Sequence, residues 1–265
     1  MLIVGESING TIEKVGKAIA DRDRQFIQGL ARQQVERGAQ MIDVNAGMGG
    51  RDESSDLTWL VEVVQGEVDV SLMIDSSDPK AIAQALAIHK GRPIVNSITA
   101  ETKKCESLLP VLAAQDCGVV ALCVTEEGIP KTSDRRLEIA RSLVAILVEA
   151  GKSPGDVYLD PLVLTVATDW QAGATTLDTL RLFKQELPEV KTIAGLSNIG
   201  FGMPVRRLIN RTFLSMCLAL GLDAAMLDVR NDGLMATLRA GQVLGGHDKW
   251  SRGYLKAFRD GKLQE

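Results

Sequence analysis

Short apolar runs alternate with longer helical patterns along the whole chain. Eight such runs, rich in Val, Ile and Leu, are separated by segments in which apolar residues recur every three or four positions. Runs that are apolar at successive positions are typical of parallel strands buried on both faces. The runs are LIVGE, QMIDVNA, VSLMIDS, RPIVNSI, GVVALCV, DVYLDPL, KTIAGLSN and AAMLDV.

The segments between these runs carry helix start and stop signals. Residues 23–38 place their large apolar side chains on one face and end at a glycine, a common helix stop. Asp78 followed by Pro79 is an N-cap with proline at the first helical position. The pattern predicts eight helices in strict alternation with the strands, and the one after the seventh strand is expected over residues 209–221.

This alternation predicts an α/β fold with a single closed (β/α)8 TIM barrel, which uses about 250 residues. A doubly wound open sheet is the alternative. We find no break in composition and no long linker, so residues 1–265 are expected to form one domain. Trp250, Tyr254 and Phe258 recur at helical spacing, which predicts a C-terminal helix at about 250–260 outside the barrel or at a dimer interface.

Composition narrows the class of protein. The net charge is −4 and the basic residues form no stripe, which argues against a nucleic-acid partner. No run reaches the roughly 18 apolar residues of a membrane span, and the N-terminus has no signal-peptide pattern. The four cysteines form no C-x-x-C pair and lie far from both histidines in sequence, so a zinc site and disulfides are not expected. We expect a cytoplasmic protein.

Acidic and amide residues end most of the strand runs, at the rim where a barrel has its active site. Any single one is explained by a helix cap or a turn, but the set forms a ring of carboxylates and carboxamides. No histidine or lysine ends a run, which disfavours a histidine base and Schiff-base chemistry. The ring consists of Glu6, Asp43, Asn45, Asp75, Asn96, Asp160, Ser197, Asn198 and Asp228.

Such a ring is able to hold a divalent metal or to bind a heterocycle rich in N–H groups, because a carboxylate accepts two parallel hydrogen bonds from an N–C–N edge. The glycines of AGLSNIGFG, residues 194–202, fit neither phosphate-binding glycine pattern.

Several strings at the expected strand ends carry a resemblance to one family, in order and without a large gap from Leu2 to about Asp228. They are GESING, DVNAG, IDSSDPKAI, VNSITAE, GIPKTSDRR, YLDPLVL, GLSNIGFGMPVRRLINRTFL and GLDAAMLD. The chain resembles the methyltetrahydrofolate:corrinoid-protein methyltransferases, pterin-binding barrels related to the folate domain of cobalamin-dependent methionine synthase and to dihydropteroate synthase.

The resemblance implies a pterin site. Asp75, Asn96 and Asp160 match the family's pterin contacts, with Asp160 on the 2-amino and N3–H edge. Asn198 matches the catalytic amide near N5 of the pterin, and Gly195 and Ser197 flank it.

Other matched positions have less definite roles. Arg206 matches an arginine that lines the folate site. Phe201 stands where a relative carries a polar side chain, and an aromatic ring is able to stack on the substrate there. Glu6, Asp43 and Asn45 are expected to support the site, Glu6 and Asp43 through a proton relay.

The resemblance implies methyl transfer between N5 of tetrahydrofolate and the cobalt of a corrinoid, without a metal bound by this chain. The cobalamin-binding signature D-x-H-x-x-G is absent from the sequence, so a separate corrinoid protein is expected to dock at the barrel mouth. A homodimer is expected from the family. The alternatives are a dihydropteroate synthase-like enzyme, a folate-binding protein without catalysis, and a metal-dependent aldolase or hydrolase.

Overall fold

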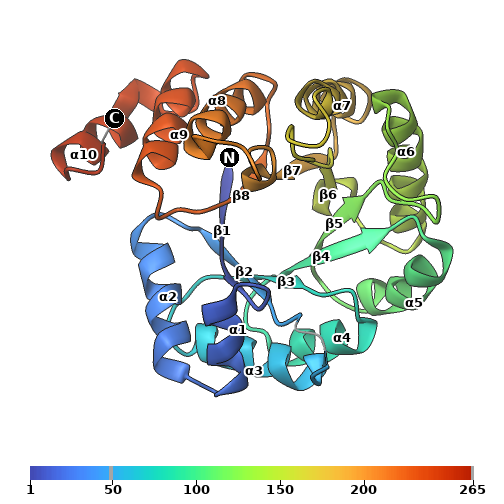
Figure 1. The fold of residues 1–265 in the computed structure, drawn as a ribbon. Coiled ribbons are helices and arrows are strands. Elements are labelled where there is room, and N and C mark those ends of the chain that lie inside the picture. Colours follow the sequence, from blue (N-terminus) through green and yellow to red (C-terminus); the bar gives the residue numbers. More distant parts are fainter. Residues whose placement is uncertain (48–49, 264–265) are drawn as a thin grey trace.

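The strands close into a barrel. The computed structural model describes residues 1–47 and 50–263, and in it eight parallel strands follow one another around the barrel in chain order, with the last pairing to the first. Figure 1 shows the helices outside this ring. The expected barrel is confirmed and the open sheet is excluded. The strands are β1 (Leu2–Asn9), β2 (Met41–Asn45), β3 (Leu72–Asp75), β4 (Ile94–Thr99), β5 (Gly118–Leu122), β6 (Val157–Asp160), β7 (Lys191–Gly195) and β8 (Ala224–Leu227).

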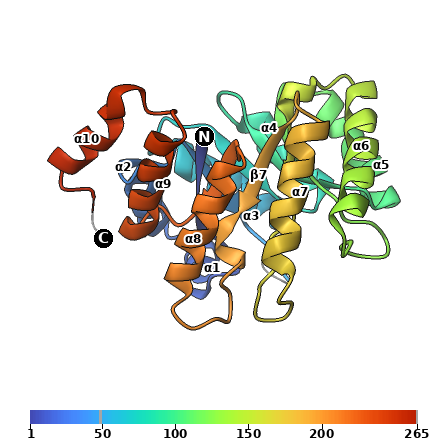
Figure 2. The ribbon, with the colours of Figure 1, turned by 90° about the horizontal axis from the view of Figure 1, so that it is seen from above.

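Helices follow the strands and cover the outside of the barrel, as the side view in Figure 2 shows for α7, α8 and α9. The predicted cap is confirmed, because the Asp78 carboxylate accepts a hydrogen bond from the backbone of Lys80 and Pro79 begins the helix. The helices are α1 (Glu13–Ala20), α2 (Arg24–Glu36), α3 (Glu53–Gln65), α4 (Pro79–Ile88), α5 (Thr102–Ala113), α6 (Ser133–Glu149), α7 (Ala172–Glu186), α8 (Arg206–Ala219), α9 (Asp232–Leu244) and α10 (Arg252–Arg259).

Three element boundaries differ from the sequence prediction. Strand β1 continues past Glu6, because after an irregularity in its pairing with β2 Ile8 is buried in the layer between the barrel and the helices. The segment after β1 forms the short helix α1, which buries Val15 and Ile19. Helix α8 begins at Arg206 rather than at 209, so this arginine lies in the first helical turn.

The barrel interior is packed with side chains below the site. Each strand contributes an apolar residue to this layer, so no open channel runs along the axis. In barrels of this kind the active site lies at the carboxyl-end rim of the strands. The layer comprises Val4, Met41, Met73, Ile94, Val120, Tyr158, Ile193 and Ala224.

Helix α10 lies outside the barrel beside α9 (Figure 1). Its Phe258 is 69% exposed, and Trp250 just before it is 75% exposed. Among the described helices, none has the length and apolar character that a bilayer crossing requires.

Candidate functional site

Three predicted site residues stand side by side across neighbouring strands. Asn45 of β2 is in register with Asp75 of β3, and Asp75 is in register with Asn96 of β4. Asp160 ends β6, in register with Leu122 of β5. Because the strands are parallel, their carboxyl ends meet at one rim, and these side chains share the barrel mouth.

Asp43 lies beneath this row and is almost completely buried. The side-chain amide of Asn96 donates a hydrogen bond to its Oδ1 at 3.4 Å. Burial raises the pKa of Asp43 well above its usual value, and the nearby carboxylates of Asp75 and Glu6 raise it further. A carboxyl group in this setting tends to hold its proton, so Asp43 is able to act as a hydrogen-bond donor to its neighbours.

Two carboxyl groups at the mouth titrate close to neutral pH. Burial raises the pKa of Asp75 to about 6, against the opposing effect of a hydrogen bond from Asn45. Burial also raises the pKa of Asp160 to about 6, although its Oδ1 accepts a hydrogen bond from the backbone N–H of Leu162 at 2.7 Å. An N–H-rich heterocycle at the mouth would supply hydrogen-bond donors to the ionised forms of both groups.

Arg136 of α6 supports the turn after Asp160, and the sequence analysis missed it. Its buried guanidinium donates hydrogen bonds to the backbone carbonyls of Pro130, Pro161 and Leu162. It thereby fixes the backbone that presents Asp160. The signal was available in the sequence, since this arginine falls on the buried face of its helix, where an arginine needs partners to be tolerated.

Asn198 ends a short 3-10 turn, Leu196–Asn198, directly after β7. The residue is exposed, and its amide has no hydrogen-bond partner within the described ranges. The amide folds back over Gly195, where an added Cβ would lie 3.5 Å from the Asn198 Nδ2. The amide is therefore free to bind a ligand at the mouth.

Two contacts hold the residue before Asn198. The hydroxyl of Ser197 donates a hydrogen bond to the carboxylate of Glu6, and the Arg206 guanidinium donates one to the Ser197 carbonyl at 2.6 Å. Burial raises the pKa of Glu6, while the hydrogen bond from Ser197 lowers it. Arg206 also lies over the ring of Phe201, 5.6 Å from its centroid. This set of contacts fixes the strand-end backbone and leaves the Asn198 side chain unbound.

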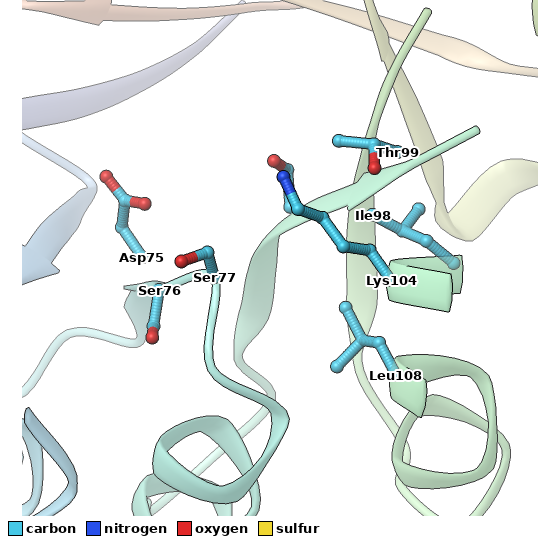
Figure 3. A pocket seen from close by; sticks show the side chains of 8 residues that line it. Asp75, Ser76, Ser77, Ile98, Thr99, Lys104 and Leu108 are labelled. Carbon is cyan, nitrogen blue, oxygen red and sulfur yellow. The ribbon is translucent and has the colours of Figure 1, made fainter. Parts of the chain in front are cut away.

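A small polar cavity of about 100 Å³ opens beside Asp75 (Figure 3). Ser77 and Ser97 line it, with Lys104 reaching in from α5. Lys104 is paired with Glu101 at 2.7 Å, so its charge is already balanced. We assign this space to a few water molecules.

The predicted site residues therefore fall into two groups around one mouth. Glu6, Asp43, Asn45, Asp75 and Asn96 lie on the side of β1 to β4, and Asp160, Gly195, Ser197, Asn198, Phe201 and Arg206 lie on the side of β6 to α8. The hydrogen bond from Ser197 to Glu6 links the two groups. Across residues 1–47 and 50–263, no three His, Cys, Asp or Glu side chains are arranged to hold a metal ion.

Comparisons with known proteins show the family of the chain. Residues 5–228 match the family model described as pterin binding enzyme. The chain is 34% identical over 265 residues to the methylcorrinoid:tetrahydrofolate methyltransferase of Eubacterium limosum, covering 99% of this chain and 98% of that protein. It is 29% identical over 240 residues to the methionine synthase of Mycobacterium tuberculosis, covering 86% of this chain but 20% of that longer enzyme.

Solved structures support the fold. The dihydropteroate synthase of Xanthomonas albilineans in complex with 7,8-dihydropteroate aligns with a TM-score of 0.64 at 18% identity, over 94% of this chain and 93% of that one. The Yersinia pestis dihydropteroate synthase aligns with a TM-score of 0.66 at 14% identity, over 92% and 91% of the two chains. At these identities the likeness concerns the barrel alone.

Proposed function

The chain belongs to the pterin-binding enzyme family, and on that premise we propose that it is a methyltransferase acting between N5 of tetrahydrofolate and the cobalt of a corrinoid held by a separate protein. The observation that carries the proposal is the full-length similarity to a methylcorrinoid:tetrahydrofolate methyltransferase. The ring of carboxyl and amide groups at the barrel mouth agrees with it.

Asp160, Asp75 and Asn96 bind the pterin in this proposal. The ionised Asp160 accepts two hydrogen bonds from the 2-amino and N3–H edge, because that edge has the spacing of a carboxylate. Asn96 and Asp75 face the N1 and N8 side, where the amide of Asn96 is able to donate or accept. The pyrimidine edge is thereby fixed, and N5 points toward the end of β7.

Asn198 assists the methyl transfer at N5. A neutral tertiary amine is a poor leaving group, so loss of the methyl group needs a donor that strengthens its hydrogen bond as charge develops on N5. The unbound amide of Asn198 is such a donor, and a group that interacts more strongly in the transition state lowers the barrier. Burial raises the pKa of Glu6 and of Asp43 near this point, which favours their protonated forms, and Asn45 lies beside Asp75.

The cobalt of the partner protein is the nucleophile when the methyl group leaves the folate, and the methyl donor in the reverse direction. In both directions it must reach the reacting methyl group through the mouth. The loops on the β6 and β7 side expose large apolar side chains there, with Trp170 at 84% and Val205 at 74% exposure, beside Phe201 at 64%. The two loops are tied together, since Thr165 donates a hydrogen bond to the Phe201 carbonyl. We assign this edge to the docking of the corrinoid protein.

A homodimer is a further part of the proposal. An apolar groove of about 410 Å³ runs between α7 and α8, with Leu208 and Met216 exposed along it. This face, or the exposed aromatic residues of α10, is suited to a second copy of the chain. A cytoplasmic location agrees with the cysteines, all of which are buried free thiols.

The direct test is single-turnover methyl transfer. The purified protein is mixed with 5-methyltetrahydrofolate and cob(I)alamin, and with methylcobalamin and tetrahydrofolate in the reverse direction. The expected result is formation of methylcobalamin or of methyltetrahydrofolate. Folate binding without methyl transfer in either direction would show that the chain is a folate-binding protein without catalysis. Product formation from a pterin pyrophosphate and aminobenzoate would show that it is a dihydropteroate synthase-like enzyme.

A further inference from the structure

Strand β1 contains an extra residue at the point where it reaches the mouth. Gly5 and Ile8 are in register with β2 residues that are two positions apart, so two residues of β1 stand opposite one residue of β2. These two residues are Glu6 and Ser7. The arrangement is a β-bulge, which bends a strand and re-aims a side chain, and bulges are frequent beside active sites. The side chain that this bulge directs is Glu6, whose carboxylate accepts the hydroxyl of Ser197.

A glutamine from outside the barrel supports the bulge. Gln34 of α2 is completely buried, and its Oε1 accepts a hydrogen bond from the backbone N–H of Ser7 at 3.0 Å. The extra residue of a bulge is left without a partner in the strand ladder, and a buried N–H without an acceptor is costly. Gln34 therefore supplies the acceptor that β2 does not, from a helix that packs on the outside of β1.

Gly5 makes room for this amide. A Cβ added at Gly5 would lie 2.4 Å from the Oε1 of Gln34 and 3.0 Å from its Cδ. A side chain at this position would therefore push the amide away from the N–H of Ser7. The bulge accommodates the glutamine only because one of its residues has no side chain.

Packing alone does not explain a glutamine at this place. The Nε2 of Gln34 is buried and has no hydrogen-bond partner among the described residues. Buried polar atoms are nearly always paired, so the amide costs stability that an apolar side chain of the same size would not cost. Departures of this kind from local rules are expected at functional sites. The bond from Ser7 is the one polar contact that the described structure gives to the Gln34 side chain.

We infer that Gln34 is a positioning residue for methyl transfer, acting from outside the barrel through the bulge at Ser7 on the Glu6 carboxylate. The inference rests on the proposed function. Glu6 holds the turn that carries Asn198, so a bulge that relaxes displaces the acceptor of the Ser197 hydroxyl and with it the amide at N5. A small misplacement at the reaction centre lowers the rate strongly. The pterin contacts, which lie on β3, β4 and β6, stay in place.

The first test is Gln34→Met, which nearly keeps the size of the side chain and removes the oxygen that accepts from Ser7. Its single-turnover rate of methyl transfer is expected to fall about three- to tenfold, and no further than the rate of Glu6→Ala. The dissociation constant of methyltetrahydrofolate, measured by calorimetry, should change by less than about twofold. Gln34→Glu keeps an oxygen at the same place and should retain most of the activity.

A double variant separates positioning from general damage to the fold. Because Gln34 acts through Glu6, adding Gln34→Met to Glu6→Ala is expected to cause no further loss of rate. An independent structural effect would instead lower the rate by the same factor in both backgrounds. The inference is wrong if the two factors are equal, or if Gln34→Met transfers methyl at the wild-type rate.

Gln40→Met is the matched control. The Oε1 of Gln40 accepts a hydrogen bond from the backbone N–H of Ile3 at 3.0 Å, on the same strand but before the bulge, and its loss should leave the transfer rate unchanged. If Gln34→Met does not fold, Gly5→Ala takes its place in both tests, since the added Cβ displaces the same amide. Absence of methyl transfer by the wild type in both directions would instead refute the proposed function.

Discussion

Ser197, directly after β7, donates a hydrogen bond to Glu6 of β1. These residues are 191 positions apart in the chain, and β8 lies between their strands in the barrel. The bond therefore crosses the end of β8 and anchors the turn that carries Asn198 to the first strand. Burial raises the pKa of Glu6, while the hydrogen bond from Ser197 lowers it.

Removing this anchor should reduce catalysis more than folate binding. Glu6→Ala is expected to lower the rate of methyl transfer about tenfold, because the Asn198 amide is then less well positioned. The misplaced amide stabilises the transition state less, while the affinity for folate in the ground state stays nearly the same. Glu6→Gln keeps an acceptor for Ser197 and should retain most of the activity. Single-turnover rates and folate dissociation constants are measured for the two variants from pH 5 to 8. Equal losses in the two variants would show that the carboxyl group itself takes part in proton transfer.

Asn198→Ala should cut methyl transfer by at least about tenfold, since one preorganised donor is worth that much or more. Folate should still bind, because the pterin edge is held by Asp160 and Asn96. The measurement is the single-turnover rate beside the dissociation constant of methyltetrahydrofolate. A variant that transfers methyl at the wild-type rate would remove Asn198 from the mechanism.

The fold and the strand-end ring follow from the sequence because both depend on local signals. A buried parallel strand is visible as a continuous apolar run, and the residue after it lies at the rim by geometry. Asp75, Asn96 and Asp160 are placed in this way. Their pairing across strands, such as Asn96 with Asp43, depends on register, which no single strand specifies.

Long-range and unpatterned contacts could not be predicted. The bond from Ser197 to Glu6 joins residues that are 191 positions apart. Arg136 was recognisable as a buried arginine on its helix, but its partners, which are backbone carbonyls of other segments, carry no sequence signature. The start of α8 was placed three residues late, because Val205 adopts the left-handed region before it and no N-cap side chain marks the position. The sequence therefore predicts which residues lie at the strand ends better than it predicts the contacts that support them.

Folate affinity should depend on pH with a midpoint near 6. Burial raises the pKa of Asp75 and of Asp160 to about 6, and the pterin N–H groups require the ionised carboxylates. Affinity is expected to be constant above about pH 7 and to fall as the pH drops through 6, since a proton must then leave before binding. Calorimetry from pH 5 to 8 measures this. In Asp160→Ala, affinity should be weaker overall, with a shallower pH dependence.

Chelators should leave the activity unchanged if the ring binds a heterocycle rather than a cation. The prediction is that dialysis against EDTA alters neither the folate dissociation constant nor the single-turnover rate. The alternative reading, a metal-dependent aldolase or hydrolase, requires a loss that added Mg²⁺, Mn²⁺ or Zn²⁺ restores. The free corrinoid is added after dialysis, so that its cobalt is not exposed to the chelator.

Asp160→Asn should stabilise the fold at neutral pH even though it weakens folate binding. The pKa of Asp160 is about 6 in the folded protein, above its ordinary value of 3.8, so the folded state binds the proton more tightly than the unfolded state. Stability contributed by this proton is complete below pH 3.8 and is lost as the pH rises from there through 6. Asparagine carries no charge, and its Oδ1 is still able to accept the Leu162 backbone hydrogen bond.

The variant should therefore unfold at a higher temperature than the wild type at pH 8, by about 3 °C or more for a domain of this size, and by a smaller margin at pH 5, which lies between the two pKa values. Differential scanning calorimetry of the ligand-free proteins gives both values. Asp260→Asn, an exposed position on the periphery, should change neither. An equal gain for Asp160→Asn at the two pH values would mean that packing, and not the buried charge, limits stability at the mouth.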